Sequence, residues 1–141
     1  MNAFGTATAL GGAAVLGKAP RSEVAFVHLV EMGLPTRTLQ RLARLGDLTP
    51  EELTQIIPRR TLTHLKTRRR LTPEQSDRVA RAAGAFAFAQ EVFANRDKAN
   101  RWMRQANRAL DGATPLSLLR TGSGTNLVET ILVRIAAGVY S

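Results

Sequence analysis

The sequence predicts an all-α protein, and two observations lead to that prediction. Apolar residues recur at helical spacing along most of the 141-residue chain, and no segment alternates apolar and polar residues as a half-buried strand would. The letters LTPE occur twice, at residues 48–51 and 71–74. Each copy places Thr at an N-cap, Pro at the first helical position and Glu or Gln at the third, a capping box that marks a helix start.

The spacing predicts helices in a definite order, interrupted by Gly33, Gly46 and Pro58. The expected ranges are 22–32, 35–45, 50–57, 59–69, 73–94, 95–110 and 126–138. The helix over 73–94 has apolar residues on more than one side, so we expect it to lie inside the bundle and to join the front half of the chain to the back half.

Three regions are expected along the chain: residues 1–20, 21–72 and 73–141. The first is rich in Ala, Gly and Thr, lacks a basic start and is interrupted by glycines. It is therefore expected to be a flexible arm in preference to an export signal. Residues 121–125 read TGSGT and are expected to be a flexible break. No run approaches the ~20 apolar residues of a membrane span.

The charge is unevenly distributed. The chain has 20 Lys and Arg against 11 Asp and Glu, a net charge of +9, which points first to nucleic acid as a partner. Residues 59–81 hold eight of the bases and two acids, whereas residues 124–141 hold one of each. These two regions are therefore expected to meet different partners.

The sequence offers no catalytic or metal-binding constellation. It has no cysteine, which excludes a disulfide scaffold, a thiolate zinc site and a Cys nucleophile, and fits a cytoplasmic location. His28 and His64 are far apart, and neither has the partner that a helical zinc site requires. We expect a binding protein that is not an enzyme and needs no metal or cofactor.

The stretch IPRRTLTHLKTRRRL, residues 57–71, is the strongest functional signal. A helix, a sharp turn at Pro58 and a second helix with a buried Leu62–Leu65 edge have the layout of a helix-turn-helix. The first residues of the second helix are expected to contact base edges of DNA. The basic side chains that follow, through Arg70, are expected to contact phosphates. The alternative is a solvated charged face. The expected DNA-binding residues are Arg59, Arg60, Thr61, Thr63, His64, Lys66, Thr67 and Arg69.

Four motifs follow one another within residues 23–141: PRRTL, LTPEQSDR, the pattern W-x-x-x-x-N-x-x-L-x-G-x-T-P-L-x-L-L that begins at Trp102, and the final GVYS. In this order they resemble the Xre/MbcA/ParS antitoxins. It implies an N-terminal Xre-like helix-turn-helix bundle joined by the long central helix to a C-terminal helical toxin-binding region.

The resemblance also implies the antitoxin of a type II toxin–antitoxin pair. Its partner would be a RES-domain toxin that degrades NAD, whose active site the C-terminal region covers. The complex would bind its own promoter double-stranded DNA and repress it, with a homodimer inside the larger assembly. The resemblance places toxin binding in the last helix and the residues after it. The expected toxin-binding residues there are Asn126, Leu127, Glu129, Thr130, Arg134, Val139, Tyr140 and Ser141.

The residues themselves leave alternatives open. The nearly uncharged final helix can fold back onto the bundle instead of meeting a partner. The chain can be a stand-alone helix-turn-helix repressor whose C-terminal helices only dimerise it, or a toxin-neutralising protein whose basic helix does not read DNA.

Overall fold

The structure, a computed structural model, describes residues 3–139 and is all-α, as predicted. Among these residues the extended pairing consists of one isolated antiparallel bridge, between Pro35 and Arg70. The elements in chain order are α1 (Ala3–Ala9), α2 (Gly12–Leu16), α3 (Glu23–Met32), α4 (Thr38–Gly46), α5 (Pro50–Leu53), α6 (Arg59–Leu65), α7 (Pro73–Phe93), α8 (Arg96–Trp102), the 3₁₀ turns η1 (Arg108–Leu110) and η2 (Leu116–Leu118), and α9 (Gly122–Ala136).

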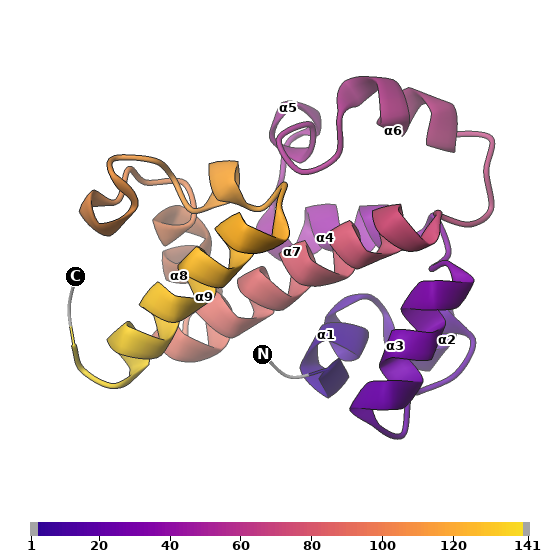
Figure 1. Cartoon of the computed structure of the whole chain (residues 1–141), viewed down its shortest axis with the longest axis horizontal. Coiled ribbons are helices and arrows are strands. Elements are labelled where there is room, and N and C mark those ends of the chain that lie inside the picture. Colours follow the sequence, from indigo (N-terminus) through magenta and orange to yellow (C-terminus); the bar gives the residue numbers. More distant parts are fainter. Residues whose placement is uncertain (1–2, 140–141) are drawn as a thin grey trace.

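Helix α7 is the axis of the fold (Figure 1), which confirms the predicted central helix. Helices α1, α3, α4, α8 and α9 all pack against it. Its buried side chains are mostly alanines, which let several helices approach closely, with Val79 and Phe86 filling the space between them. At the end of α4 the chain comes so close that a Cβ on Gly46 would lie 2.8 Å from the Phe86 ring.

Both predicted capping boxes are present. Thr49 Oγ1 accepts a hydrogen bond from the Glu52 amide at 3.1 Å, and Glu52 Oε1 accepts one from the Thr49 amide at 3.0 Å. Thr72 and Gln75 repeat the arrangement at 3.1 and 2.9 Å at the start of α7. These reciprocal bonds satisfy amide groups that a helix start otherwise leaves unpaired.

The two helices of the expected helix-turn-helix are shorter than predicted. Helix α5 ends at Leu53 because Ile56 and Ile57 are fully buried in the turn that follows. Helix α6 ends at Leu65, and after a short turn residues 68–71 form hydrogen bonds with residues 34–36. Tertiary packing, which local propensity does not report, sets both ends.

The prediction of a flexible arm over residues 1–20 is wrong for the part that folds into α1 and α2. Leu10 is fully buried, Ala7 nearly so, and α1 packs on α7 (Figure 1). The small residues that suggested mobility are the ones that fit against an alanine-rich helix, so the segment is part of the core.

The expected flexible break at residues 121–125 is also wrong, because these residues form the start of α9. Thr121 is the N-cap, and its Oγ1 accepts a hydrogen bond from the Gly124 amide at 3.0 Å. The expected helix over 95–110 divides instead into α8 and η1, because the chain folds back and Leu116 donates its amide proton to the Met103 carbonyl at 2.9 Å.

In the described part of the chain, no helix is long and apolar enough to cross a membrane.

Candidate nucleic-acid interface and toxin-binding surface

Helix α6 presents most of the predicted DNA-binding residues on one side. Leu65 is buried beneath the helix and Leu62 is half-buried, so the opposite face is turned outward. A hollow on that face is lined by five of the eight predicted residues together with Gln75 of α7, while Lys66, Thr67 and Arg69 lie exposed in the turn beyond the helix. The five are Arg59, Arg60, Thr61, Thr63 and His64.

The charged groups of this face remain available to a partner. Arg59 forms an ion pair with Glu51 at 2.6 Å, with 68% and 74% of the two side chains exposed. The hydrogen bond that Arg59 donates to the Glu51 carboxylate raises the pKa of the Arg59 guanidinium. Because exposed ion pairs contribute little net stability, Arg59 can exchange the carboxylate for a phosphate. Arg60 and Lys66 are exposed.

Several other side chains in this region already have partners within the fold. The Thr63 hydroxyl donates to the Arg59 carbonyl at 3.1 Å, and the Thr67 hydroxyl lies 3.5 Å from the His64 carbonyl. His64 Nε2 lies 3.3 Å from a guanidinium nitrogen of Arg68. Arg70, expected at phosphates, donates from Nη1 to the Gly33 carbonyl at 2.7 Å and therefore has a structural contact as well.

The second candidate surface is the outer side of α9. Asn126, Leu127, Thr130 and Arg134 of the predicted set are exposed there at spacings of three and four residues, so they form one stripe along the helix. Leu127 has 55% of its surface exposed and Val133 has 56%. Sequence reasoning missed Val133, although its position three residues after Thr130 and seven after Asn126 places it at the edge of the same stripe.

The remaining predicted toxin-binding residues are placed differently. Glu129 is half-buried, and burial raises the pKa of its carboxyl group. Val139 is exposed just after the end of α9. Tyr140 and Ser141 lie outside the described residues. The inner face of α9 carries the buried residues Val128, Ile131 and Leu132, and α9 packs on α7. The helix therefore folds back onto the bundle and still leaves Leu127 and Val133 exposed outside.

No described group of His, Asp and Glu side chains has the arrangement of a metal site.

Comparison with known proteins gives a family match for each half of the chain. Residues 25–84 match the family described as the antitoxin Xre-like helix-turn-helix domain, and residues 88–138 match the antitoxin Xre/MbcA/ParS C-terminal toxin-binding domain. An antitoxin Xre of Pseudomonas putida is 40% identical over 107 residues, covering 75% of this chain and 67% of that relative. The chain belongs to the Xre antitoxin family.

Two further relatives carry the same description. An antitoxin Xre of Yersinia enterocolitica is 30% identical over 120 residues, covering 82% of this chain and 81% of the relative. One of Photorhabdus laumondii is 36% identical over 73 residues, about half of each chain. The protein is therefore an antitoxin with a DNA-binding and a toxin-binding domain, and the family is not enzymatic.

In this antitoxin the two domains are joined by hydrogen bonds from the toxin-binding half to carbonyl groups of the DNA-binding half. Asn100 and Gln90 both donate to the Leu45 carbonyl, at 3.2 and 2.7 Å. Arg104 donates to the Gly46 and Asp47 carbonyls at 2.7 and 2.8 Å. These carbonyls lie at the C-terminal end of α4, where a helix leaves acceptors unpaired.

Other arginines extend the same junction. Arg96 donates to the Arg44 carbonyl and to Asp47 Oδ1, the latter at 3.0 Å. Arg120 donates to the Thr54 and Gln55 carbonyls at 3.0 and 3.2 Å, just before the turn that leads into α6. Sequence reasoning missed all of these residues, because nothing in local spacing distinguishes them from surface arginines.

Proposed function

We propose that this antitoxin neutralises a RES-type, NAD-consuming toxin by covering its active site, and that the pair binds the operon promoter and represses it. The observation that carries the proposal is the presence of two unlike surfaces on one chain. One is cationic and lies on α6, and the other is nearly uncharged and lies on α9. The choice of a RES-type toxin rests on the family resemblance of the motifs around Trp102 and at the C-terminus.

On the DNA side, α6 would enter the major groove. Arg60 and His64 line the outward hollow and are suited to base edges, because arginine pairs bidentately with guanine. The binding unit would be a homodimer, for which the operator should contain two half-sites about one helical turn apart. Since promoter DNA and NAD are both found in the cytoplasm, we place the antitoxin there.

On the toxin side, the outer stripe of α9 would form the contact. The exposed apolar residues Leu127 and Val133, on either side of Asn126, Thr130 and Arg134, combine apolar area with polar groups that fix orientation. Continuation of the chain through Val139 toward its C-terminus would reach the toxin's active-site entrance.

Co-expression with the product of the neighbouring gene tests the proposal. We expect that product alone to arrest growth and deplete NAD, and this chain to restore both and to co-purify with it. The purified complex should shift DNA from its own upstream region in a gel. DNA binding without rescue would instead support a stand-alone repressor whose C-terminal helices only dimerise it, and rescue without DNA binding would support a neutraliser that does not read DNA.

A further inference from the structure

The turn after α6 is held rigidly against the start of α4. The Thr36 amide donates to the Arg69 carbonyl and the Thr36 hydroxyl to the Arg68 carbonyl, both at 2.9 Å. The Leu71 amide donates to the Leu34 carbonyl at 2.8 Å. Because these bonds use backbone atoms of the turn, they fix its course without engaging the side chains of Arg68 and Arg69.

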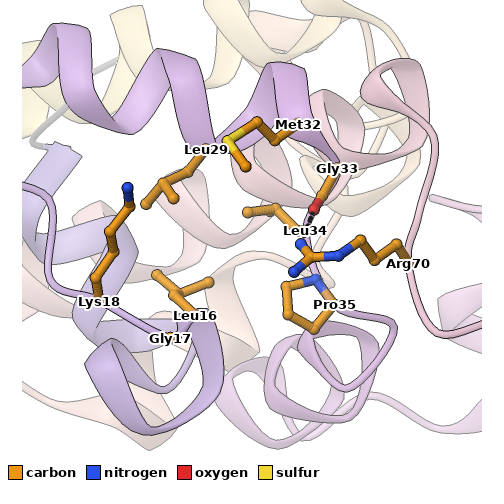
Figure 2. A pocket seen from close by; sticks show the side chains of 9 residues that line it. All are labelled: Leu16, Gly17, Lys18, Leu29, Met32, Gly33, Leu34, Pro35 and Arg70. Atoms are coloured by element: carbon orange, nitrogen blue, oxygen red, sulfur yellow. Dashed lines mark hydrogen bonds between the residues drawn. The ribbon is translucent and has the colours of Figure 1, made fainter.

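Arg70 adds a side-chain contact to this pairing of residues 34–36 with residues 68–71, which we call the clamp. Figure 2 shows its guanidinium group directed at the Gly33 carbonyl, beside Leu34 and Pro35, and the hydrogen bond measures 2.7 Å. Gly33 has a φ of 94°, and a Cβ there would overlap the Leu71 carbonyl oxygen, so the close approach of the two segments depends on glycine.

Beside this clamp lies a hollow that we call the basic groove. One side is formed by Pro35, Thr36 and four arginines, and the other by the end of α2. Val15 and Leu16 on the α2 side are buried, so the groove offers a partner mainly cationic side chains and backbone. The arginines are Arg37, Arg68, Arg69 and Arg70.

The charge of the basic groove is not neutralised within the fold. No acidic side chain lines it, and none of its arginines takes part in an ion pair among the described residues. Like charges gathered in a concave surface repel one another and raise the local potential, which favours binding of an anion. Arg37, Arg68 and Arg69 are exposed, and arginine pairs bidentately with phosphate oxygens.

The groove is continuous with the face expected to read DNA. Arg68, at its edge, contacts His64 of α6, and the turn that forms the groove leads directly out of α6. We propose that the basic groove holds the phosphodiester backbone beside the major groove that α6 enters, with Arg37 and Arg68 as its principal contacts. This inference rests on the proposed DNA binding by α6.

The geometry favours a nucleic-acid backbone over an acidic polypeptide. The groove lies beside the turn that follows α6, so DNA whose major groove holds α6 would bring one of the two flanking strands of phosphates toward it. Such contacts fix the register of the protein on the duplex without reading sequence. Helices α1 and α2, which were expected to be a flexible arm, would then support the surface that contacts the DNA backbone.

The test compares the salt dependence of operator binding by wild-type antitoxin, an Arg37→Gln/Arg68→Gln variant and a control. The control, Arg101→Gln/Arg108→Gln, removes two exposed arginines of the toxin-binding half and so changes net charge equally. We expect the slope of log K against log salt to fall in magnitude by about 2 in the groove variant, close to 0.9 per lost phosphate contact, and to stay unchanged in the control.

Hydroxyl-radical footprinting supplies a second readout. The groove variant should lose backbone protection at the outer edge of the footprint while keeping its preference for the operator sequence. If the double variant does not fold, Arg37→Gln alone should lower the slope by about 1.

An unchanged slope and footprint in the groove variant, or an equal change in the control, would overturn the inference and leave DNA reading by α6 intact. Absence of wild-type binding to the upstream DNA would overturn both.

Discussion

Arg104 and Glu52 join the toxin-binding half of the antitoxin to its DNA-binding half. Arg104 Nε lies 2.6 Å from Glu52 Oε2, and Nη2 lies 3.0 Å from Oε1. The same Glu52 carboxylate accepts the Thr49 amide in the capping box of α5. With 28% and 22% of their side chains exposed, the two residues are largely shielded from solvent. One contact therefore supports both a helix start and the junction between domains.

Removal of this contact should weaken the fold. Arg104→Ala takes away the pairing with Glu52 and the donors to the Gly46 and Asp47 carbonyls, and we expect unfolding free energy to fall by about 2–3 kcal/mol. Urea denaturation measures the change. Glu52→Gln is the matched variant, because Gln75 shows that glutamine completes the same capping box. It should cost less than Arg104→Ala, and an equal or larger cost would show that the charge, and not the set of hydrogen bonds, dominates.

The same pair predicts a pH dependence. The hydrogen bond from Arg104, opposed by burial, lowers the pKa of Glu52 below its ordinary value of 4.5. The unfolded chain therefore takes up the proton first, so the stabilisation is complete above about 4.5 and is lost as pH falls through the lower folded pKa. The difference in melting temperature between wild type and Glu52→Gln should shrink as pH drops below 4.5. A difference that stays constant into strong acid would contradict this assignment.

Changes on α6 should separate the two functions. Arg59→Ala combined with Arg60→Ala removes two exposed cations from the outward hollow without touching α9, so promoter binding should be lost while toxin neutralisation is kept. Gel shifts and growth rescue measure the two activities. Arg101→Gln/Arg108→Gln again controls for net charge. Equal loss of both activities would mean that the variant is misfolded or that one surface serves both partners.

Changes on α9 should have the opposite effect. Leu127→Asp combined with Val133→Asp places two charges on the exposed side of α9, where burial against a toxin would leave them without partners. We expect neutralisation and co-purification to fail while operator binding remains. Val24 and Val27 of α3 are equally exposed, so the same substitutions there form the control for added charge. If the α3 variant fails and the α9 variant rescues, the toxin contact lies on α3.

The parts of the fold that sequence reasoning predicted are those that local chemistry decides. Thr49 and Thr72 mark helix starts because the bonds that cap a helix join residues three positions apart. The outward face of α6 was predictable for a similar reason, since the spacing of Leu62 and Leu65 determines which side of a short helix is buried.

Long-range contacts decide the parts that were predicted wrongly or missed. Residues 3–9 and 12–16 fold into helices because Leu10 and its neighbours become buried and α1 packs against α7, far along the chain. Arg104 looks like any surface arginine in the sequence, and its role depends on carbonyls more than fifty positions away. Val133 stands out as an exposed apolar residue only when the packed side of α9 is known.

Substitutions at the start of α9 test whether residues 121–125 form a packed helix start or a flexible segment. Gly124 is buried, and a Cβ built on it would overlap the Leu118 carbonyl oxygen, which is backbone and cannot easily move. Gly124→Ala should therefore lower unfolding free energy by about 1–3 kcal/mol through overpacking, even though alanine is the better helix former.

Gly122→Ala provides the control for that variant. Its Cβ would meet only the Arg81 guanidinium, the end of a flexible side chain, so the helix preference of alanine should offset most of the cost. Thermal melts of both variants decide between a packed helix start and a mobile segment. In a mobile segment both alanines would be tolerated alike. In the observed packing Gly124→Ala melts several degrees lower than Gly122→Ala. Because the exposed stripe on α9 depends on this helix start, Gly124→Ala should weaken toxin binding as well.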